Sequence, residues 1–503
     1  MLQTTFRSSS LNILAQLICA KGAGVIVYDP KRLLIHDESS SFNLEETSYG
    51  LLRRIEATDP ANTCLFNLSE DELTIPAPGW LVEFDGGYAY PGMKSVELSF
   101  VSNKDGSPRW IYPSGLRKPR FLAFYNFNGW KANLYKFLVK TAFALHVPTM
   151  VRNGRFVVHY SRDIYVETLL MPVSGSIRDY AIFTGAAELN RKAVVAEGRD
   201  KRVGSFLKIA LNKSSAENIK NEHNSLSLLG HIPFKSTVIP KVWRINDQVI
   251  RVSNAKPVKA RKQRKFGQSH CRFLRDLYDA SFERQYYRQM EITGETRERL
   301  LQLASNPKLR EKTGAQELFH KLQVLEEQLH VMNPMLGTSV CHGDFTPRTV
   351  RTRGDNLHVC DWESSRQSMP VLFDLFHYVI GEKAFSGNGT VNVLRARLDA
   401  LLNSPIPAWF LRERGLEPSL YLRLYLLHHS ARYLETYLSQ GVLQQKDHQL
   451  FSVWSDLLGK VAAEPGDLSK PVPDCKPNFP EAKIIRLEDF GRSSHIGNTL
   501  SNA

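Results

Sequence analysis

The order of apolar and polar residues indicates strands and one helix in the first 165 residues. Apolar and polar residues alternate at 24–28, 80–84 and 96–101, which is typical of half-buried strands. Residues 131–145 have the apolar spacing of a helix. We therefore predict an α/β or α+β module for residues 1–165. The aromatic residues of segment 109–130 are expected in its core, because Phe, Tyr and Trp are mostly buried in folded proteins.

A second pattern begins near residue 178, where short strand-like runs follow one another and are separated by glycine and charged residues. This pattern predicts an antiparallel meander. Ser214 and Glu217 have the spacing of a capping box, so we expect a helix from there to Leu229, ended by Gly230. The expected strands are 180–183, 192–195, 205–211, 238–245 and 248–252.

After residue 270 the apolar period becomes that of helices. The clearest helix begins at Ser419, with Pro418 just before it and Gly441 just past its end. The tail, 463–503, is rich in proline and has no periodicity, so we expect it to be extended or disordered. The expected helices are 271–290, 315–332, 372–379, 391–402, 419–438 and 449–461.

Composition narrows the functional classes. The 503 residues predict about three domains at roughly 150 residues each, and two larger domains fit equally well. With 42% hydrophobic and 23% charged residues, the chain is not mainly disordered. The 65 Lys and Arg against 51 Asp and Glu give a net charge of +14, which favours anionic partners such as nucleotides, lipid head groups or nucleic acid. Six scattered cysteines favour a reducing compartment, the cytoplasm, and the sequence predicts no membrane span.

Residues 339–363 contain the residue types that phosphoryl transfer requires. An apolar lead-in places His342-Gly343-Asp344 on a loop, and two short strands follow about the turn 354–356. Such a hairpin returns the chain beside its start, so Asp361 is expected close to Asp344. Two converging carboxylates are suited to ligate Mg²⁺ and to orient a hydroxyl. Taken alone, however, the His-Gly-Asp tripeptide is better explained as a turn whose histidine bonds the backbone.

A second feature lies about 130 residues upstream. Lys208 is inside an apolar strand, where its ammonium needs an anionic partner if the strand is half buried. On the helix that follows, Glu222 falls on the same face as the apolar Ile219 and Leu226. We therefore predict an ion pair between Lys208 and Glu222.

Residues 178–462 resemble the aminoglycoside phosphotransferase and choline kinase-like family. The resemblance comes from a strand lysine, a helix glutamate and two loop aspartates that follow one another in this order. The resemblance implies an α+β, protein-kinase-like, two-lobed phosphotransferase. Its lobes would be a small antiparallel-sheet N-lobe, 178–252, and a mainly helical C-lobe, 253–462. Residues 1–165 would form a separate N-terminal module before them.

The resemblance also assigns roles to residues, with ATP and Mg²⁺ as cofactors. It implies that Lys208 contacts the α- and β-phosphates and that Glu222 holds Lys208. Asp344 would be the catalytic base, next to His342 in the catalytic motif. Asp361 would bind the metal. Asp374 falls where the family has a helix aspartate that supports the catalytic loop.

Two positions depart from the family pattern. The family has an asparagine that ligates Mg²⁺ five residues after the catalytic aspartate, and this chain has Thr349, whose hydroxyl is the candidate ligand. The loop that covers the phosphates has no glycine-rich signature, and its candidates are Gly185 and segment 174–176.

Several functional hypotheses remain open. The first is a small-molecule kinase acting on a hydroxyl of a sugar, an aminoglycoside-like acceptor or an amino alcohol, with the N-terminal module shaping the acceptor site or docking a protein partner. The second is a pseudokinase that binds nucleotide or acts as a scaffold. The third, disfavoured, is a nucleic-acid-binding protein. The basic run at 256–265 is explained equally well as a solvated loop or as a site for an acidic acceptor or nucleic acid.

Overall fold

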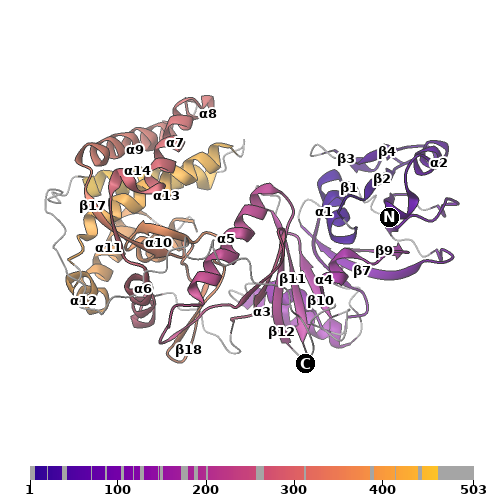
Figure 1. Cartoon of the computed structure of the whole chain (residues 1–503), viewed down its shortest axis with the longest axis horizontal. Coiled ribbons are helices and arrows are strands. Elements are labelled where there is room, and N and C mark those ends of the chain that lie inside the picture. Colours follow the sequence, from indigo (N-terminus) through magenta and orange to yellow (C-terminus); the bar gives the residue numbers. More distant parts are fainter. Residues whose placement is uncertain are drawn as a thin grey trace, which may run out of the picture. The chain divides into compact units, whose positions relative to one another are not determined.

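The computed structural model divides the chain into two compact units (Figure 1). The first unit contains residues up to 223 together with 242–254, and the second contains 224–241 together with the chain from 255 onward. The described residues are 6–462, without 20, 37–41, 70, 85–87, 104–106, 117, 125–129, 146, 148–150, 171–178, 186–190, 200–201, 257–264, 311–312, 386–389, 414 and 440–444. The predictions for the tail, for segment 174–176 and for most of the basic run lie outside these residues.

One large sheet forms the frame of the first unit. In sheet order its described strands are β14 (Val242–Asn246), β15 (Val249–Ser253), β12 (Arg202–Ala210), β11 (Lys192–Arg199), β10 (Tyr180–Phe183), β8 (Pro108–Pro113), β7 (Lys94–Ser102), β9 (Gly154–Tyr160), β6 (Trp80–Phe84), β5 (Thr63–Asn67), β2 (Gly24–Tyr28) and β4 (Asn43–Glu45). Neighbours from β4 to β6 are parallel, and all the others are antiparallel. The strands expected at 24–28, 80–84 and 180–183 have these bounds.

The predicted meander is not separate from the N-terminal strands. β10 pairs with β8, Ile182 opposite Ile111, so residues of both predicted domains share one sheet. Each set of strands would otherwise expose an unpaired edge, and pairing the two edges satisfies their backbone N–H and C=O groups. The prediction of a separate N-terminal module is therefore wrong as far as the sheet is concerned, because its strands continue into those of the predicted N-lobe.

Helices cover this sheet, and their apolar residues form the core with it. α1 (Ser8–Ile18) and α4 (Tyr165–Leu170) bury leucine and isoleucine side chains in the largest cluster of the unit. α3 (Trp130–Ala144) packs in a second cluster with Trp110, Tyr112 and Phe121, which are all buried. The helix expected at 131–145 is thus confirmed, and so is the core position of Trp110, Tyr112 and Phe121. Trp130, at the end of the same aromatic segment, is 71% exposed, so the prediction is wrong for that residue.

Helix α5 (Lys213–Leu229) follows β12 and contains Glu222. The expected helix is present, but its N-terminal cap is not the predicted Ser214. The side chain of Asn212 accepts a hydrogen bond from the backbone N–H of Ser215 at 2.8 Å. Asparagine is as good a cap as serine, so spacing alone did not distinguish the two residues.

The second unit is mainly helical, which confirms an α+β chain with a helical C-terminal part. Its long helix α13 (Pro418–Ser439) runs through the largest core and contacts α7, α9 and α14. The other helices are α6 (Gln268–Ser281), α7 (Glu291–Ala304), α8 (Pro307–Arg310), α9 (Thr313–Met332), α10 (Phe373–Phe385), α11 (Val391–Leu402), α12 (Pro405–Glu413) and α14 (Gln445–Ala462). Two small sheets have the orders β16 (Glu283–Tyr286), β17 (Met335–Cys341), β20 (Arg366–Pro370) and β13 (Thr237–Val238), β19 (Asn356–Val359), β18 (Val350–Arg353).

The helix expected at 271–290 is shorter than predicted. It ends at Ser281, and Glu283–Tyr286 becomes strand β16, paired antiparallel with β17. The local apolar spacing suits both structures, and the pairing with a strand 50 residues away decides between them. Within the described residues, no helix is long and apolar enough to cross a membrane.

Candidate active site

The His342-Gly343-Asp344 motif leaves the end of buried strand β17 as a loop. The His342 ring is fully buried and uses both of its nitrogens for backbone contacts. Its Nδ1 accepts the N–H of Asp344 at 3.2 Å, and its Nε2 donates to the carbonyl of Cys360 at 3.1 Å. The ring also lies against Trp362, with centroids 4.5 Å apart. His342 therefore fastens the Asp344 loop to the chain that follows the β18–β19 hairpin.

Gly343 and Asp374 explain why this loop is so tight. Gly343 has φ +77°, and a Cβ added to it would meet the carbonyl oxygen of Ser364 at 2.1 Å, so no other residue fits. The buried carboxylate of Asp374, in the first turn of α10, accepts the backbone N–H groups of His342 at 2.6 Å and Gly343 at 3.0 Å. Burial raises the pKa of Asp374, and the histidine and these N–H groups oppose that rise. The support of the loop by Asp374 is confirmed.

Asp344 is a partly exposed residue of the loop. Its side chain is 36% exposed, so a solute can reach it, whereas His377 beside it is almost fully buried. His377 Nε2 lies 3.3 Å from Asp344 Oδ1, and His377 Nδ1 lies 3.2 Å from the hydroxyl of Tyr425. With the proton on Nε2, the tyrosine donates to the histidine and the histidine donates to the carboxylate. This series of hydrogen bonds fixes one carboxylate oxygen of Asp344 and leaves the other oxygen for a ligand.

Thr349 is buried, and its hydroxyl bonds within the same loop. It donates to the carbonyl oxygens of Asp344 at 2.7 Å and Thr346 at 3.1 Å, and it accepts the N–H of Thr346 at 3.1 Å. The expectation that Thr349 ligates Mg²⁺ stays a prediction, but these contacts give the hydroxyl a bracing function of its own.

Replacing Thr349 tests this bracing function. Thr349→Ala leaves the buried N–H of Thr346 without its hydroxyl acceptor, which costs about 1–3 kcal/mol of unfolding free energy. Thr349→Ser keeps the hydroxyl and is expected to stay near wild type. Chemical denaturation of both variants measures the difference. If the bonds within the loop are unimportant, the two variants will unfold at the same denaturant concentration.

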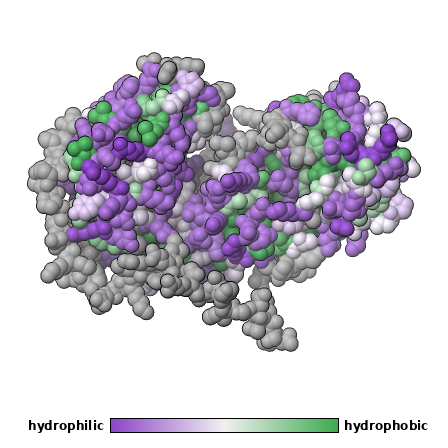
Figure 2. All heavy atoms as spheres, turned by 45° about the horizontal axis from the view of Figure 1, so that its top comes forward, coloured by the Kyte–Doolittle hydropathy of each residue, from purple (hydrophilic) through white to green (hydrophobic). Residues whose placement is uncertain are grey.

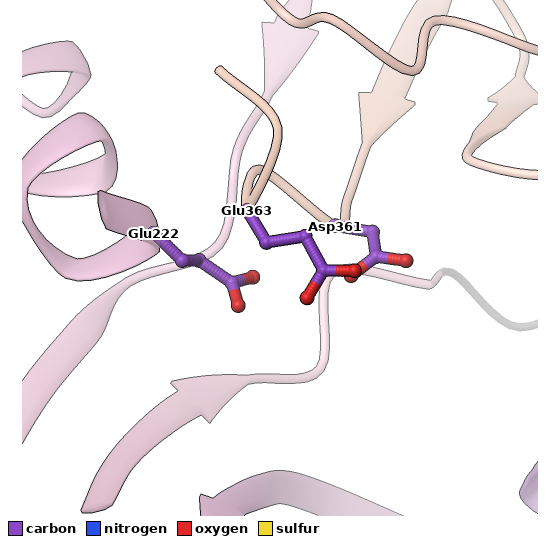
Figure 3. Close-up of side chains that lie close together, drawn as sticks. All are labelled: Glu222, Asp361 and Glu363. Carbon is purple, nitrogen blue, oxygen red and sulfur yellow. The ribbon is translucent and has the colours of Figure 1, made fainter. Parts of the chain in front are cut away.

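The hairpin β18–β19 places two further carboxylates on the next loop. Cys360 N–H bonds to the carbonyl of Thr349 at 3.0 Å, which closes the hairpin as predicted and sets Asp361 directly after it. Asp361 has φ +74°, a backbone conformation that is uncommon outside glycine and concentrated at functional sites. Figure 3 shows the carboxylates of Asp361 and Glu363 side by side, with oxygens within 4.8 Å of each other. Glu222, drawn in the same view, belongs to the first unit.

These two carboxylates suit a divalent metal ion. Carboxylate oxygens are the ligands that Mg²⁺ prefers, and two negative charges this close repel each other without a cation. The donor set therefore fits the Mg²⁺ that the resemblance implies, with Glu363 as a ligand candidate beside Asp361.

The predicted ion pair in the first unit is present. Lys208 of β12 and Glu222 of α5 are both buried, and Lys208 Nζ contacts Glu222 Oε1 at 2.7 Å and Oε2 at 2.6 Å. Gly185 lies just after β10 with φ +74°, so the chain turns there in a conformation that favours glycine. A contact of Lys208 or Gly185 with phosphate stays a prediction.

Two residues of the second unit were not assigned a role from sequence. Glu363 lies two residues after Asp361 in the sequence, and that spacing was a usable signal. His377 is one turn after Asp374 on α10, which places both on one helix face, but its contact with Asp344 spans 33 residues and left no local signal.

Comparisons with known proteins return structural similarity only. No family model and no curated protein matches the chain. The similar solved structures include the ADP-bound aminoglycoside phosphotransferase APH(2'')-Ib, at 11% identity and TM-score 0.34, covering 58% of this chain and 97% of that one. A choline/ethanolamine kinase family protein from Mesorhizobium loti is 16% identical, with TM-score 0.38 and coverages of 60% and 95%. A thermostable mutant of APH(4)-Ia, in a complex with AMP-PNP and hygromycin B, is 15% identical, with TM-score 0.38 and coverages of 59% and 99%.

These proteins come from the family that the sequence motifs resemble. Identities of 11–16% and TM-scores below 0.4 do not transfer a function. A function for this chain therefore has to follow from the geometry of its own residues.

Proposed function

We propose that the chain is an ATP- and Mg²⁺-dependent phosphotransferase that acts on a hydroxyl group of a small molecule. The observation that carries the proposal is the arrangement around Asp344. This solvent-accessible carboxylate is held by a buried histidine, on a loop fastened by Asp374 and by the hairpin that carries Asp361. Phosphoryl transfer requires charge placement and little covalent chemistry from the protein, so rigidly held carboxylates are suited to it.

Each residue has one role in the proposed reaction. Asp344 orients the acceptor hydroxyl and takes its proton while the acceptor oxygen bonds to the γ-phosphorus and the bond from that phosphorus to the ADP oxygen breaks. Asp361 and Glu363 would hold Mg²⁺, which when bound would neutralise charge on the phosphates. Lys208, held by Glu222, binds the α- and β-phosphates, and the turn at Gly185 covers them. His342 acts through the loop as a positioning residue.

The residues with proposed roles belong to both units. Lys208 and Glu222 belong to the first unit, and Asp344, Asp361 and Glu363 to the second.

A turnover assay tests the function. The full chain is incubated with γ-labelled ATP, Mg²⁺ and a panel of sugars, aminoglycosides and amino alcohols, and labelled product is separated from phosphate. We expect transfer to at least one acceptor class and its loss with EDTA. The pseudokinase alternative, favoured by Thr349, predicts thermal stabilisation by ATP without Mg²⁺ and no transfer to any acceptor. That result would refute the proposal.

A further inference from the structure

Helix α3 exposes an unusual amount of apolar surface. Trp130, Leu134, Phe137 and Leu138 are 71%, 48%, 64% and 55% exposed. They follow the spacing i, i+4, i+7, i+8, so they form one continuous stripe along the helix, which we call the outer stripe. Figure 2 shows one face of the molecule, which is mostly hydrophilic with several hydrophobic patches. Exposed apolar stripes of this kind mark interaction sites.

The outer stripe is not the core-facing side of the helix. A second set of residues on α3 faces the protein core: Tyr135, Val139, Ala142 and Phe143. This set has the same spacing as the outer stripe, shifted by five residues. A shift of five residues is about 1.4 helical turns, so the two stripes lie on different sides of α3. The helix is thus anchored by one side and presents a second apolar side outward. Leu145, at 68% exposure, extends that outward surface beyond the helix end.

Positive charge flanks the outer stripe. Lys131, Lys136 and Lys140 lie on the helix but outside the stripe, and Lys131 Nζ is 5.8 Å from the centre of the Trp130 ring. In the sequence, residues 106–162 contain ten Lys and Arg and no Asp or Glu, a formal charge of +10 in 57 residues. Arg120, Arg152 and Arg155 pair with acidic residues from outside this stretch. Within the described residues, Lys131 and Lys140 have no ion pair.

We propose that α3 docks on the surface of a bilayer that contains anionic lipids. Helices with Trp, Phe and Leu on one side and lysines beside them lie in the membrane interface, where the apolar residues enter the acyl boundary. Lysine side chains extend their charged ends to the lipid phosphates. Docking of this kind is peripheral and needs no membrane-spanning helix. The proposal is independent of the phosphotransferase function.

Charge favours this occupant over two others. A second copy of the chain would bring one strongly positive segment against another, which repels. A nucleic acid would need cations in the centre of its contact surface, but the centre of the outer stripe is aliphatic and aromatic and the lysines are at its sides. An anionic membrane matches both the apolar centre and the positive sides.

Vesicle flotation with the full chain tests the proposal. The vesicles are phosphatidylcholine alone, or phosphatidylcholine with phosphatidylglycerol. We expect binding to the anionic vesicles, which weakens as salt is added. Phe137→Ser/Leu138→Ser should lower the partition coefficient about tenfold or more, because both side chains then lose apolar burial in lipid. Lys131→Gln/Lys140→Gln should lower it about fivefold per lysine, from roughly 1 kcal/mol for each basic residue at the surface.

A matched control comes from the second unit. Leu301 and Val324 are 66% and 58% exposed, close to the values for Phe137 and Leu138, so Leu301→Ser/Val324→Ser removes similar exposed apolar surface. This variant is expected to bind anionic vesicles like wild type. Equal binding to neutral and anionic vesicles, or unchanged binding of the Phe137→Ser/Leu138→Ser variant, would overturn the proposal. A third contrary result would be the absence of vesicle binding together with a dimer, or with binding to a labelled oligonucleotide, that only the Phe137→Ser/Leu138→Ser variant abolishes.

Discussion

Asp344→Ala is expected to lower the turnover number of phosphoryl transfer by about 10²–10⁴-fold, the usual contribution of a positioned general base. The affinity for nucleotide is expected to stay close to wild type, because the proposed role of Asp344 is at the acceptor hydroxyl and not at the phosphates. Steady-state kinetics measures the first quantity, and calorimetric titration with a non-hydrolysable ATP analogue measures the second. A variant with wild-type turnover would remove Asp344 as the base, whatever the acceptor is.

His377 supplies a graded control for this result. His377→Ala removes the hydrogen bond to Asp344 but leaves the carboxylate in place. A hydrogen bond to a charged group contributes about 1.5–3 kcal/mol, so turnover should fall about tenfold to a hundredfold and the Michaelis constant for ATP should hardly change. His377→Gln, which retains a donor, is expected to recover part of the loss. A purely structural role of His377 would instead lower thermal stability without such recovery.

The parts of the fold that local sequence determines could be predicted. The bounds of β2, β6 and α11 agree with the predicted ranges, because the apolar period of each segment is set within the segment itself. The pairing of β8 with β10 could not be predicted, since it depends on which strand edges meet. Strand β16 was predicted as helix for a similar reason, because its partner β17 lies far along the chain.

The candidate site divides in the same way. The pairing of Lys208 with Glu222 followed from burial: a charged side chain on an apolar strand and another on an apolar helix face need each other. The return of the chain at Cys360 followed from the turn between two short strands. The function of Thr349 within its loop and the contact of His377 with Asp344 depend on side-chain directions, which no periodicity reveals.

The ion pair of Lys208 and Glu222 gives the prediction with the largest effect on stability. Both side chains are buried, so Lys208→Met leaves a carboxylate in the core without its cation. Removing one member of a buried ion pair destabilises by about 3–5 kcal/mol. A urea titration should show this loss as a lower unfolding midpoint, and phosphoryl transfer should be lost at temperatures where the variant is still folded.

The double variant Lys208→Met/Glu222→Leu separates stability from function. Replacing both members of a buried ion pair by apolar residues of similar volume is often neutral or stabilising, so the unfolding midpoint should return to near wild type. If the pair binds the triphosphate, this stable variant should still fail to transfer phosphate and should lose the thermal shift caused by ATP. If the pair serves only to hold β12 and α5 together, the stable double variant will regain turnover, and Lys208 will have no place in the nucleotide site.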